Sequence, residues 1–121
     1  MSSKTVKLSN GMSFAEIQLC QEFFRLILRA KAVGVDLNPS ESELVEVLYK
    51  DYCAATSWPI SEKISGFTRG RESRFSNGRE IFTECFVVRF VNGAERRFSF
   101  LKACSAIAKV APLSHQSVVH Q

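Results

Sequence analysis

The chain has 121 residues, enough for one hydrophobic core and too few for two domains that would each be stable alone. Its composition, 45% hydrophobic and 23% charged, is ordinary for a soluble protein, and no apolar run approaches the roughly 20 residues that span a bilayer. The amino-terminal residues lack the apolar stretch of a secretory signal, so we expect a cytoplasmic protein with no membrane partner.

The first half of the chain is predicted to be mainly helical. After a short strand over residues 5–8 and a turn at Asn10-Gly11, a capping box at residues 13–16 predicts a helix over 14–33, ended by Gly34. A second capping box at residues 40–43 predicts a helix that runs to about residue 55. The apolar stripe expected to be buried on this second helix consists of Leu44, Val47, Leu48 and Tyr52.

The second half is predicted to be mainly extended. We expect a strand over residues 64–71, a polar loop over 72–80, two hairpin strands over 82–90 and 95–100, and a helix over 101–110. Asn92-Gly93 favours a type I′ turn between the hairpin strands. Alternation places Phe86, Val88 and Phe90 on one sheet face, opposite Arg89 and its neighbours.

These elements predict an α+β fold, in which a helical hairpin and a carboxyl-terminal helix pack on a small antiparallel sheet that contains the Asn-Gly β-hairpin. We expect one domain over residues 1–111. Because Pro112 limits the last helix, residues 112–121 are predicted to form a flexible tail.

No residue pattern in the chain points to catalysis. The four cysteines lie 19 or more residues apart in apolar surroundings, which predicts buried thiols in a reducing compartment instead of a zinc site. Both histidines, His115 and His120, fall in the predicted tail, where nothing would orient a general base. We therefore expect no enzyme, no metal and no cofactor.

The charge distribution points to a polyanion. The net charge is +4, but residues 1–62 carry six Lys or Arg against eight Asp or Glu, whereas residues 63–102 carry nine against four. Arginine matches phosphate geometry and exposed aromatic rings stack on unpaired bases, so this segment favours RNA or single-stranded nucleic acid. The predicted contact residues are Arg69, Arg71, Arg74, Phe75, Arg79, Arg89, Arg96, Arg97 and Lys102. Phenylalanines in the core and arginines that merely solubilise a loop would give the same pattern.

The hairpin motif resembles that of a known family. Cys85-Phe86-x-Val88-Arg89, then Asn92-Gly93, then Phe98-Ser99-Phe100-x-Lys102 is similar to the closing motif of the DCL-like (defective chloroplasts and leaves) family. Residues 8–14 also resemble the opening of bacterial and phage-type members, and residues 63–66 resemble the family's short stretch before the hairpin. The resemblance covers about residues 6–108. Asn92 and Arg97 stand where the family has Asp, and Cys104 lies one residue beyond the expected position.

The resemblance implies a role in RNA metabolism without an established active site. Arg97 in place of an acid argues against an inherited carboxylate–metal site and makes the hairpin more basic. The leading hypothesis is a non-catalytic nucleic-acid-binding module. The alternative is a protein–protein adaptor, encoded on a mobile element, that uses the same face against an acidic protein; the residues leave the oligomeric state open.

Overall fold

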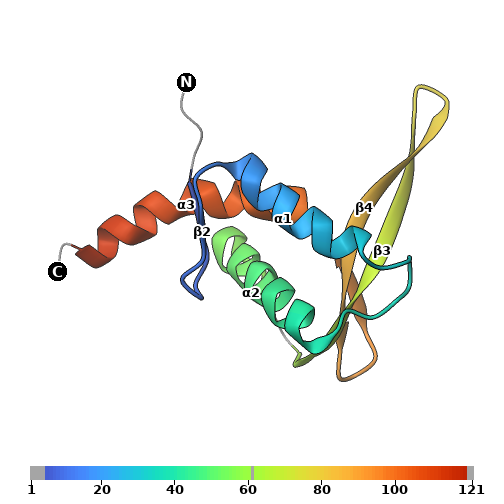
Figure 1. Ribbon diagram of the computed structural model, residues 1–121, viewed down its shortest axis with the longest axis horizontal. Helices are drawn as coiled ribbons and strands as arrows, with labels where there is room; N and C mark the ends of the chain where they lie inside the picture. The colour runs from blue at the N-terminus through green and yellow to red at the C-terminus, as the bar shows by residue number, and fades with distance from the viewer. Residues whose placement is uncertain (1–4, 61, 120–121) are drawn as a thin grey trace.

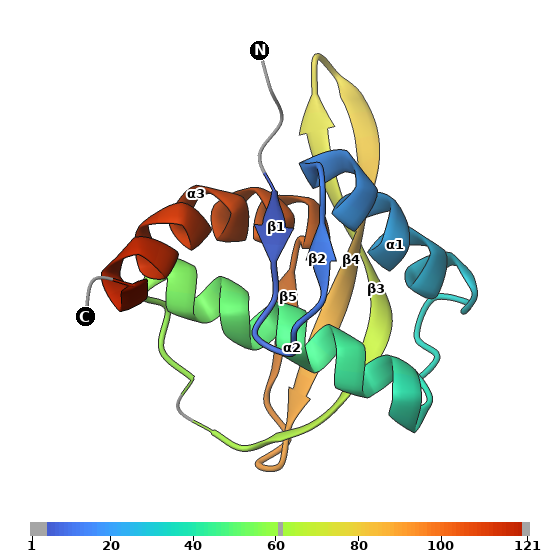
Figure 2. The same ribbon diagram turned by 60° about the vertical axis from the view of Figure 1, so that its left-hand side comes forward.

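The computed structural model describes residues 5–60 and 62–119, with side chains placed in these ranges except at residues 72 and 111–119. Three helices cover one face of a three-stranded antiparallel sheet, and a second, two-stranded sheet lies beside them (Figures 1 and 2). The α+β fold class is confirmed. The elements are β1 (Val6–Lys7), β2 (Ser13–Phe14), α1 (Ile17–Arg29), α2 (Pro39–Thr56), β3 (Ile64–Ser76), β4 (Arg79–Phe90), β5 (Glu95–Phe98) and α3 (Phe100–Val119).

The two long strands of the sheet, β3 and β4, pair along their whole length, from Ile64↔Phe90 to Ser76↔Arg79. Strand β5 pairs with β4 only between Phe86 and Arg89, so the ribbon has two strands from the Gly70↔Cys85 pair outward to Ser76↔Arg79. Figure 1 shows this outer part, residues 71–84, projecting past the helices. We call it the arm.

The polar loop predicted over residues 72–80 is therefore wrong, because those residues form the two strands of the arm and their turn. Asn77 and Gly78 connect the strands with φ angles of 53° and 76°. Two successive positive φ angles define the type I′ turn, whose twist matches that of a β-hairpin. The polar side chains suggested a loop, but a two-stranded ribbon that is open to water on both faces tolerates them.

Asn92-Gly93 also joins two strands, as predicted, but its turn is not type I′. Only Gly93 has a positive φ angle, of 90°. The Phe90 amide donates to the Ala94 carbonyl at 2.9 Å, which makes a three-residue loop that ends in a left-handed glycine. The Asn92 carboxamide oxygen accepts a hydrogen bond from the Ala94 amide at 2.9 Å, so the asparagine fixes the turn through its side chain instead of a positive φ angle.

Both predicted capping boxes are wrong. Ser13 lies in β2, paired with Lys7, and α1 begins after Glu16 with no side-chain cap. The second helix is capped by Asn38: its carboxamide oxygen accepts from the Glu41 amide at 2.8 Å, and the Glu41 carboxylate accepts from the Asn38 amide at 3.0 Å. Asn38 was missed because Pro39 follows it, although proline is well suited to the first position of a helix.

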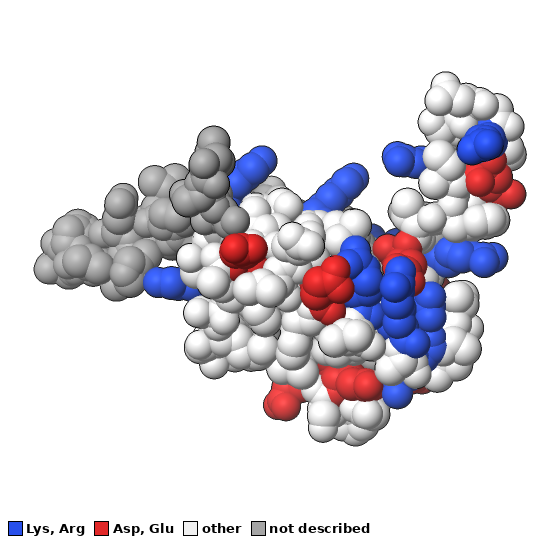
Figure 3. All heavy atoms as spheres, turned by 45° about the horizontal axis from the view of Figure 1, so that its top comes forward, with Lys and Arg blue, Asp and Glu red and all other residues white. Residues whose placement is uncertain are grey.

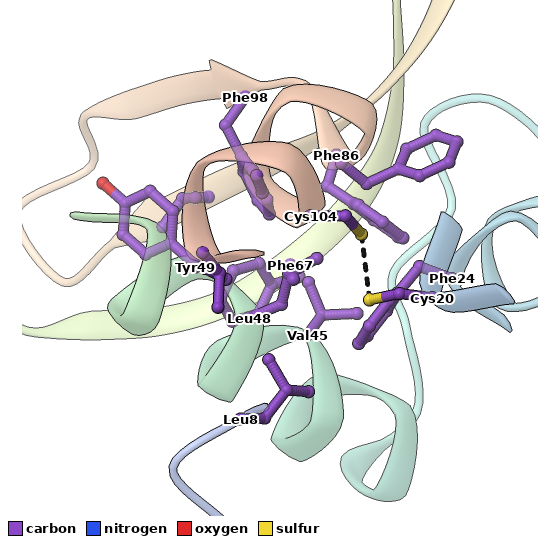
Figure 4. Packing of buried hydrophobic residues seen from close by; sticks show 14 of the residues in the cluster. Leu8, Cys20, Phe24, Val45, Leu48, Tyr49, Phe67, Phe86, Phe98 and Cys104 are labelled. Atoms are coloured by element: carbon purple, nitrogen blue, oxygen red, sulfur yellow. Dashed lines mark hydrogen bonds between the residues drawn. The ribbon is translucent and has the colours of Figure 1, made fainter. Parts of the chain in front are cut away.

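One cluster of buried side chains joins the helices to the sheet (Figure 4). On α2 the fully buried residues are Val45, Leu48, Tyr49 and Cys53, whereas Leu44, Val47 and Tyr52 are half-buried. The predicted stripe was therefore shifted by one position. This helix is apolar over a wide arc, and the aromatic rings of the sheet decide which part is covered: the Tyr49 ring lies 5.0 Å from that of Phe98.

Helix α3 packs against both other helices. All four cysteines are buried, and the Cys20 and Cys104 sulfurs, on α1 and α3, lie 3.0 Å apart (Figure 4). The predicted end of the helix before Pro112 is wrong, since α3 continues to Val119. Proline removes one helical hydrogen bond but leaves the turns on either side intact. Residues 120 and 121 of the predicted tail lie outside the described residues. Within the described residues, no helix is long and apolar enough to cross a membrane.

The Asn38 cap gives a first prediction. Replacing Asn38 with Ala should lower the free energy of unfolding by about 1 kcal/mol, because the Glu41 amide at the start of α2 loses the side-chain oxygen that accepts its hydrogen bond. Ser40→Ala is the matched control and should change stability by less than about 0.5 kcal/mol. Urea unfolding followed by circular dichroism measures both; equal losses in the two variants would contradict the assignment of the cap.

Gly70 gives a second prediction. A Cβ atom there would lie 2.5 Å from the Val87 Cγ2 and 3.1 Å from the Cys85 sulfur, so Gly70→Ala should cost about 1–3 kcal/mol by overpacking. Gly66, in the same strand, has no heavy atom within 4 Å of the position that a Cβ would take, and Gly66→Ala should be neutral or slightly stabilising. Thermal unfolding of the two variants should show a lowered midpoint for Gly70→Ala alone.

Candidate nucleic-acid interface

The arm exposes large apolar side chains beside arginines. Phe75 is 76% exposed and Phe82 is 52% exposed. The Arg71 guanidinium lies over the Phe82 ring, 4.4 Å from its centroid. Residues 34–37 cover the outer edge of β3 only as far as Arg69, where the Gly34 amide donates to the Arg69 carbonyl at 2.8 Å. The arm therefore presents aromatic faces and cationic groups to solvent, and no other strand or loop in the described part of the chain is hydrogen-bonded along its edges.

A groove of about 670 Å³ separates the arm from the rest of the molecule. Figure 3 shows this recess, with Lys and Arg side chains on both sides of it. Helix α1 contributes Arg25 and Arg29, the arm contributes Arg74 and Phe82, and the first turn of α3 contributes Lys102. The remaining lining residues are Ser73, Thr83, Glu84, Ser99, Phe100 and Leu101.

Glu84 is the only acid among the residues that line the groove, and it is already neutralised. Its carboxylate accepts two hydrogen bonds from Arg29, at 3.0 and 3.2 Å, and one from Arg69 at 3.1 Å. The hydrogen bond to Glu84 raises the pKa of the Arg29 guanidinium further above its ordinary value. This double ion pair ties α1 to the base of the arm and leaves the groove with an excess of positive charge.

Of the other cations that line the groove, one forms an ion pair and two do not. Arg25 pairs with Glu22 at 2.6 Å on the same helix and lies over the Phe100 ring. Arg74 and Lys102 form no ion pair among the side chains that the structure describes. Arg79, near the arm's tip, and Arg97 likewise form none there. These exposed groups are available to an anionic ligand.

Two of the predicted contact residues have internal roles. The Arg69 side chain is only 20% exposed and donates to the Lys31 carbonyl at 2.6 Å as well as to Glu84. Arg96 donates to the Tyr49 hydroxyl at 2.8 Å and lies 4.3 Å from the Trp58 ring centroid. Their guanidinium groups hold the sheet to the helices, so we leave them out of the interface.

Arg89 and Arg97 lie away from the groove. Phe86 and Val88 of β4 face the helices, so Val87 and Arg89, which alternate with them, face the other way. Arg97 pairs with Val87 and therefore lies on that same face, opposite the helices. Arg89 is 40% exposed and contacts Asp36 at 3.2 Å and Glu95 at 3.5 Å. The structure therefore brings together only Arg71, Arg74, Phe75, Arg79 and Lys102 of the predicted set, along the arm and its groove.

Sequence reasoning missed Arg25 and Arg29. Both directly follow buried residues of the α1 stripe, Phe24 and Leu28, and lie one turn apart at its border. That spacing indicates two cations on one side of a helix, but nothing in it indicates that the arm lies opposite. The described residues contain no group of three His, Cys, Asp or Glu that could hold a metal ion.

Comparison with known proteins adds no relative. No protein-family model, characterised protein or solved structure matches the chain significantly. The resemblance to the DCL-like family therefore stays a prediction, and the site is argued from its own chemistry.

The Tyr49 hydroxyl, which accepts the hydrogen bond from Arg96, gives a prediction about how stability depends on pH. Burial raises the pKa of the Tyr49 hydroxyl from its ordinary value of 10.0 to about 12, with an added contribution from the Cys53 thiol, whereas Arg96 acts in the opposite direction. Between these two values the unfolded chain has lost the proton that the folded chain retains. The free energy of unfolding should therefore fall as the pH rises from 10.0 towards about 12.

The measurement is a series of urea unfolding curves across this pH range for the wild type and Tyr49→Phe. The variant lacks the titrating group, so the difference in stability between the two proteins should be constant below pH 10.0 and shrink above it. A difference that stays constant over the whole range would show that Tyr49 ionises equally easily in both states.

Proposed function

We propose that this protein is a non-catalytic module that binds RNA or single-stranded DNA in the groove beside the arm. The observation that carries the proposal is the convergence of Arg25, Arg29, Arg74 and Lys102 from three separate elements on one groove. The one acid that lines it is bound by arginines. Such a surface has the charge to bind a nucleic-acid backbone, because cations that line a groove can contact successive phosphates.

The exposed phenylalanines favour unpaired bases. Base–aromatic stacking contributes about 1–3 kcal/mol per base and needs a base face that is not covered by a neighbour in a duplex. Phe82 lies in the groove, and Phe75 lies further out on the same strand pair. Phosphates bound by Arg74 and Lys102 would place bases against these rings, with Arg71 and Arg79 at the rim.

The proposed cellular location is the cytoplasm. All four cysteines are buried as thiols, which suits a reducing compartment.

Fluorescence anisotropy with labelled single-stranded RNA, single-stranded DNA and duplex DNA tests the function. Four phosphate contacts predict a slope of log affinity against log salt of about −3 for single strands, which corresponds to a loss of about 50-fold between about 50 and 200 mM salt. Single strands should bind more tightly than the duplex. Stronger binding to the duplex would contradict the stacking role of the phenylalanines.

Charge reversal locates the site. The double variant Arg74→Glu, Lys102→Glu should lower the affinity about 10-fold or more and reduce the magnitude of the salt slope by about 1.4. The double variant Lys50→Glu, Lys63→Glu is the matched control, because it makes the same change in net charge at two exposed lysines that do not line the groove. Equal losses in the two proteins would mean that net charge alone, and not the groove, determines binding.

Binding that is weak and insensitive to salt would overturn the proposal. A pull-down with and without nuclease then separates the remaining class of ligand: a protein partner that persists after nuclease treatment and is lost in the double variant indicates an acidic protein in the groove instead of a nucleic acid.

A further inference from the structure

A second hollow continues the groove along the first three turns of α3. It has a volume of about 520 Å³ and lies between α2 and α3, with Gln21 of α1 at its edge. Leu101 and Lys102 line both this hollow and the groove. The two depressions therefore meet at the start of α3, on either side of Lys102.

The second hollow carries positive charge and no negative charge in its lining. Lys102 and Lys109 are its only charged residues, and the rest are Gln21, Tyr52, Ala55, Thr56, Leu101, Ser105, Ala106 and Val110. Both lysines are exposed, and neither forms an ion pair with a described side chain. A polyanion is the ligand that this lining attracts.

The two lysines lie along α3, Lys102 where the groove and the second hollow meet and Lys109 further into the hollow. Lys102 and Lys109 lie seven residues apart in α3, which is two helical turns, so they project from the same side about 10 Å apart along the helix axis. The small side chains of Ala55 and Ala106 keep the path between α2 and α3 open, and the half-buried Tyr52 ring lies in its wall.

We propose that a single strand bound in the groove continues past Lys102 into the α2–α3 hollow, where Lys109 binds a further phosphate. This extension rests on the proposed function, and it names a second subsite of the same ligand. The continuous path predicts that the protein contacts more nucleotides than the groove alone can hold. Lys102 is the point where the two subsites join.

Two lengths of oligonucleotide separate the subsites. A labelled oligouridine of about 4 nucleotides fills the groove only, whereas one of about 12 nucleotides reaches both depressions, within the range of site sizes known for single-strand binding folds. Lys109→Glu should lower the affinity for the longer strand about 5-fold or more and reduce its salt slope by about 0.7, with little effect on the shorter strand. Ala106→Glu, which places an acid in the hollow, should do the same.

Lys50→Glu is the control, because this exposed lysine of α2 pairs with Glu46 and does not line either depression. Circular dichroism verifies that every variant folds. If Lys109→Glu weakens neither strand, or weakens both equally, the extension is wrong while the groove stands. If the wild type binds neither strand at any salt concentration, the proposed function itself fails and the extension with it.

Discussion

The structure depends on the antiparallel pairing of β3 with β4, which continues well beyond the last pair that β4 makes with β5. The inner part of this ribbon forms the sheet against which the helices pack. Among the described residues the outer part pairs with no third strand, and it projects past the helices as the arm (Figure 1). A groove beside the arm is the geometric consequence, because the arm leaves the sheet at the point where α1 and the start of α3 end their cover of it.

Glu84 connects this geometry to the charge of the surface. It lies at the base of the arm and binds Arg29 of α1 and Arg69 of β3 at once. Because both arginines neutralise it, the carboxylate that positions the arm does not repel an anionic ligand in the groove. Arg69 has a buried Nε atom with no hydrogen-bond partner among the described residues, which fits a side chain held in place by its other contacts.

The alternation of side chains along the strands decides which arginines are free to bind an anionic ligand. In the three-stranded part of the sheet, Arg69 and Arg96 point toward the helices and are used in internal hydrogen bonds, while Arg89 and Arg97 lie on the opposite face. A run of basic residues that looks continuous in the sequence is therefore divided among three surfaces. The groove gains its remaining cations from α1, far away in the chain.

Local patterns in the sequence determined the α+β class, the existence of the helices, the hairpin of β4 and β5, and the sheet face of Phe86 and Val88. Each of these depends on neighbouring residues or on the short repeat of apolar positions along a helix or strand. The same patterns misplaced both helix starts and the type I′ turn. Asn77-Gly78 and Asn92-Gly93 have the same local preference, but they adopt different turns according to the strands they join. The sequence also indicated Arg74 and Lys102. Only the tertiary structure brought Arg25 and Arg29 to the same groove, because that contact depends on how α1 lies against the arm, which begins more than forty residues after Arg29.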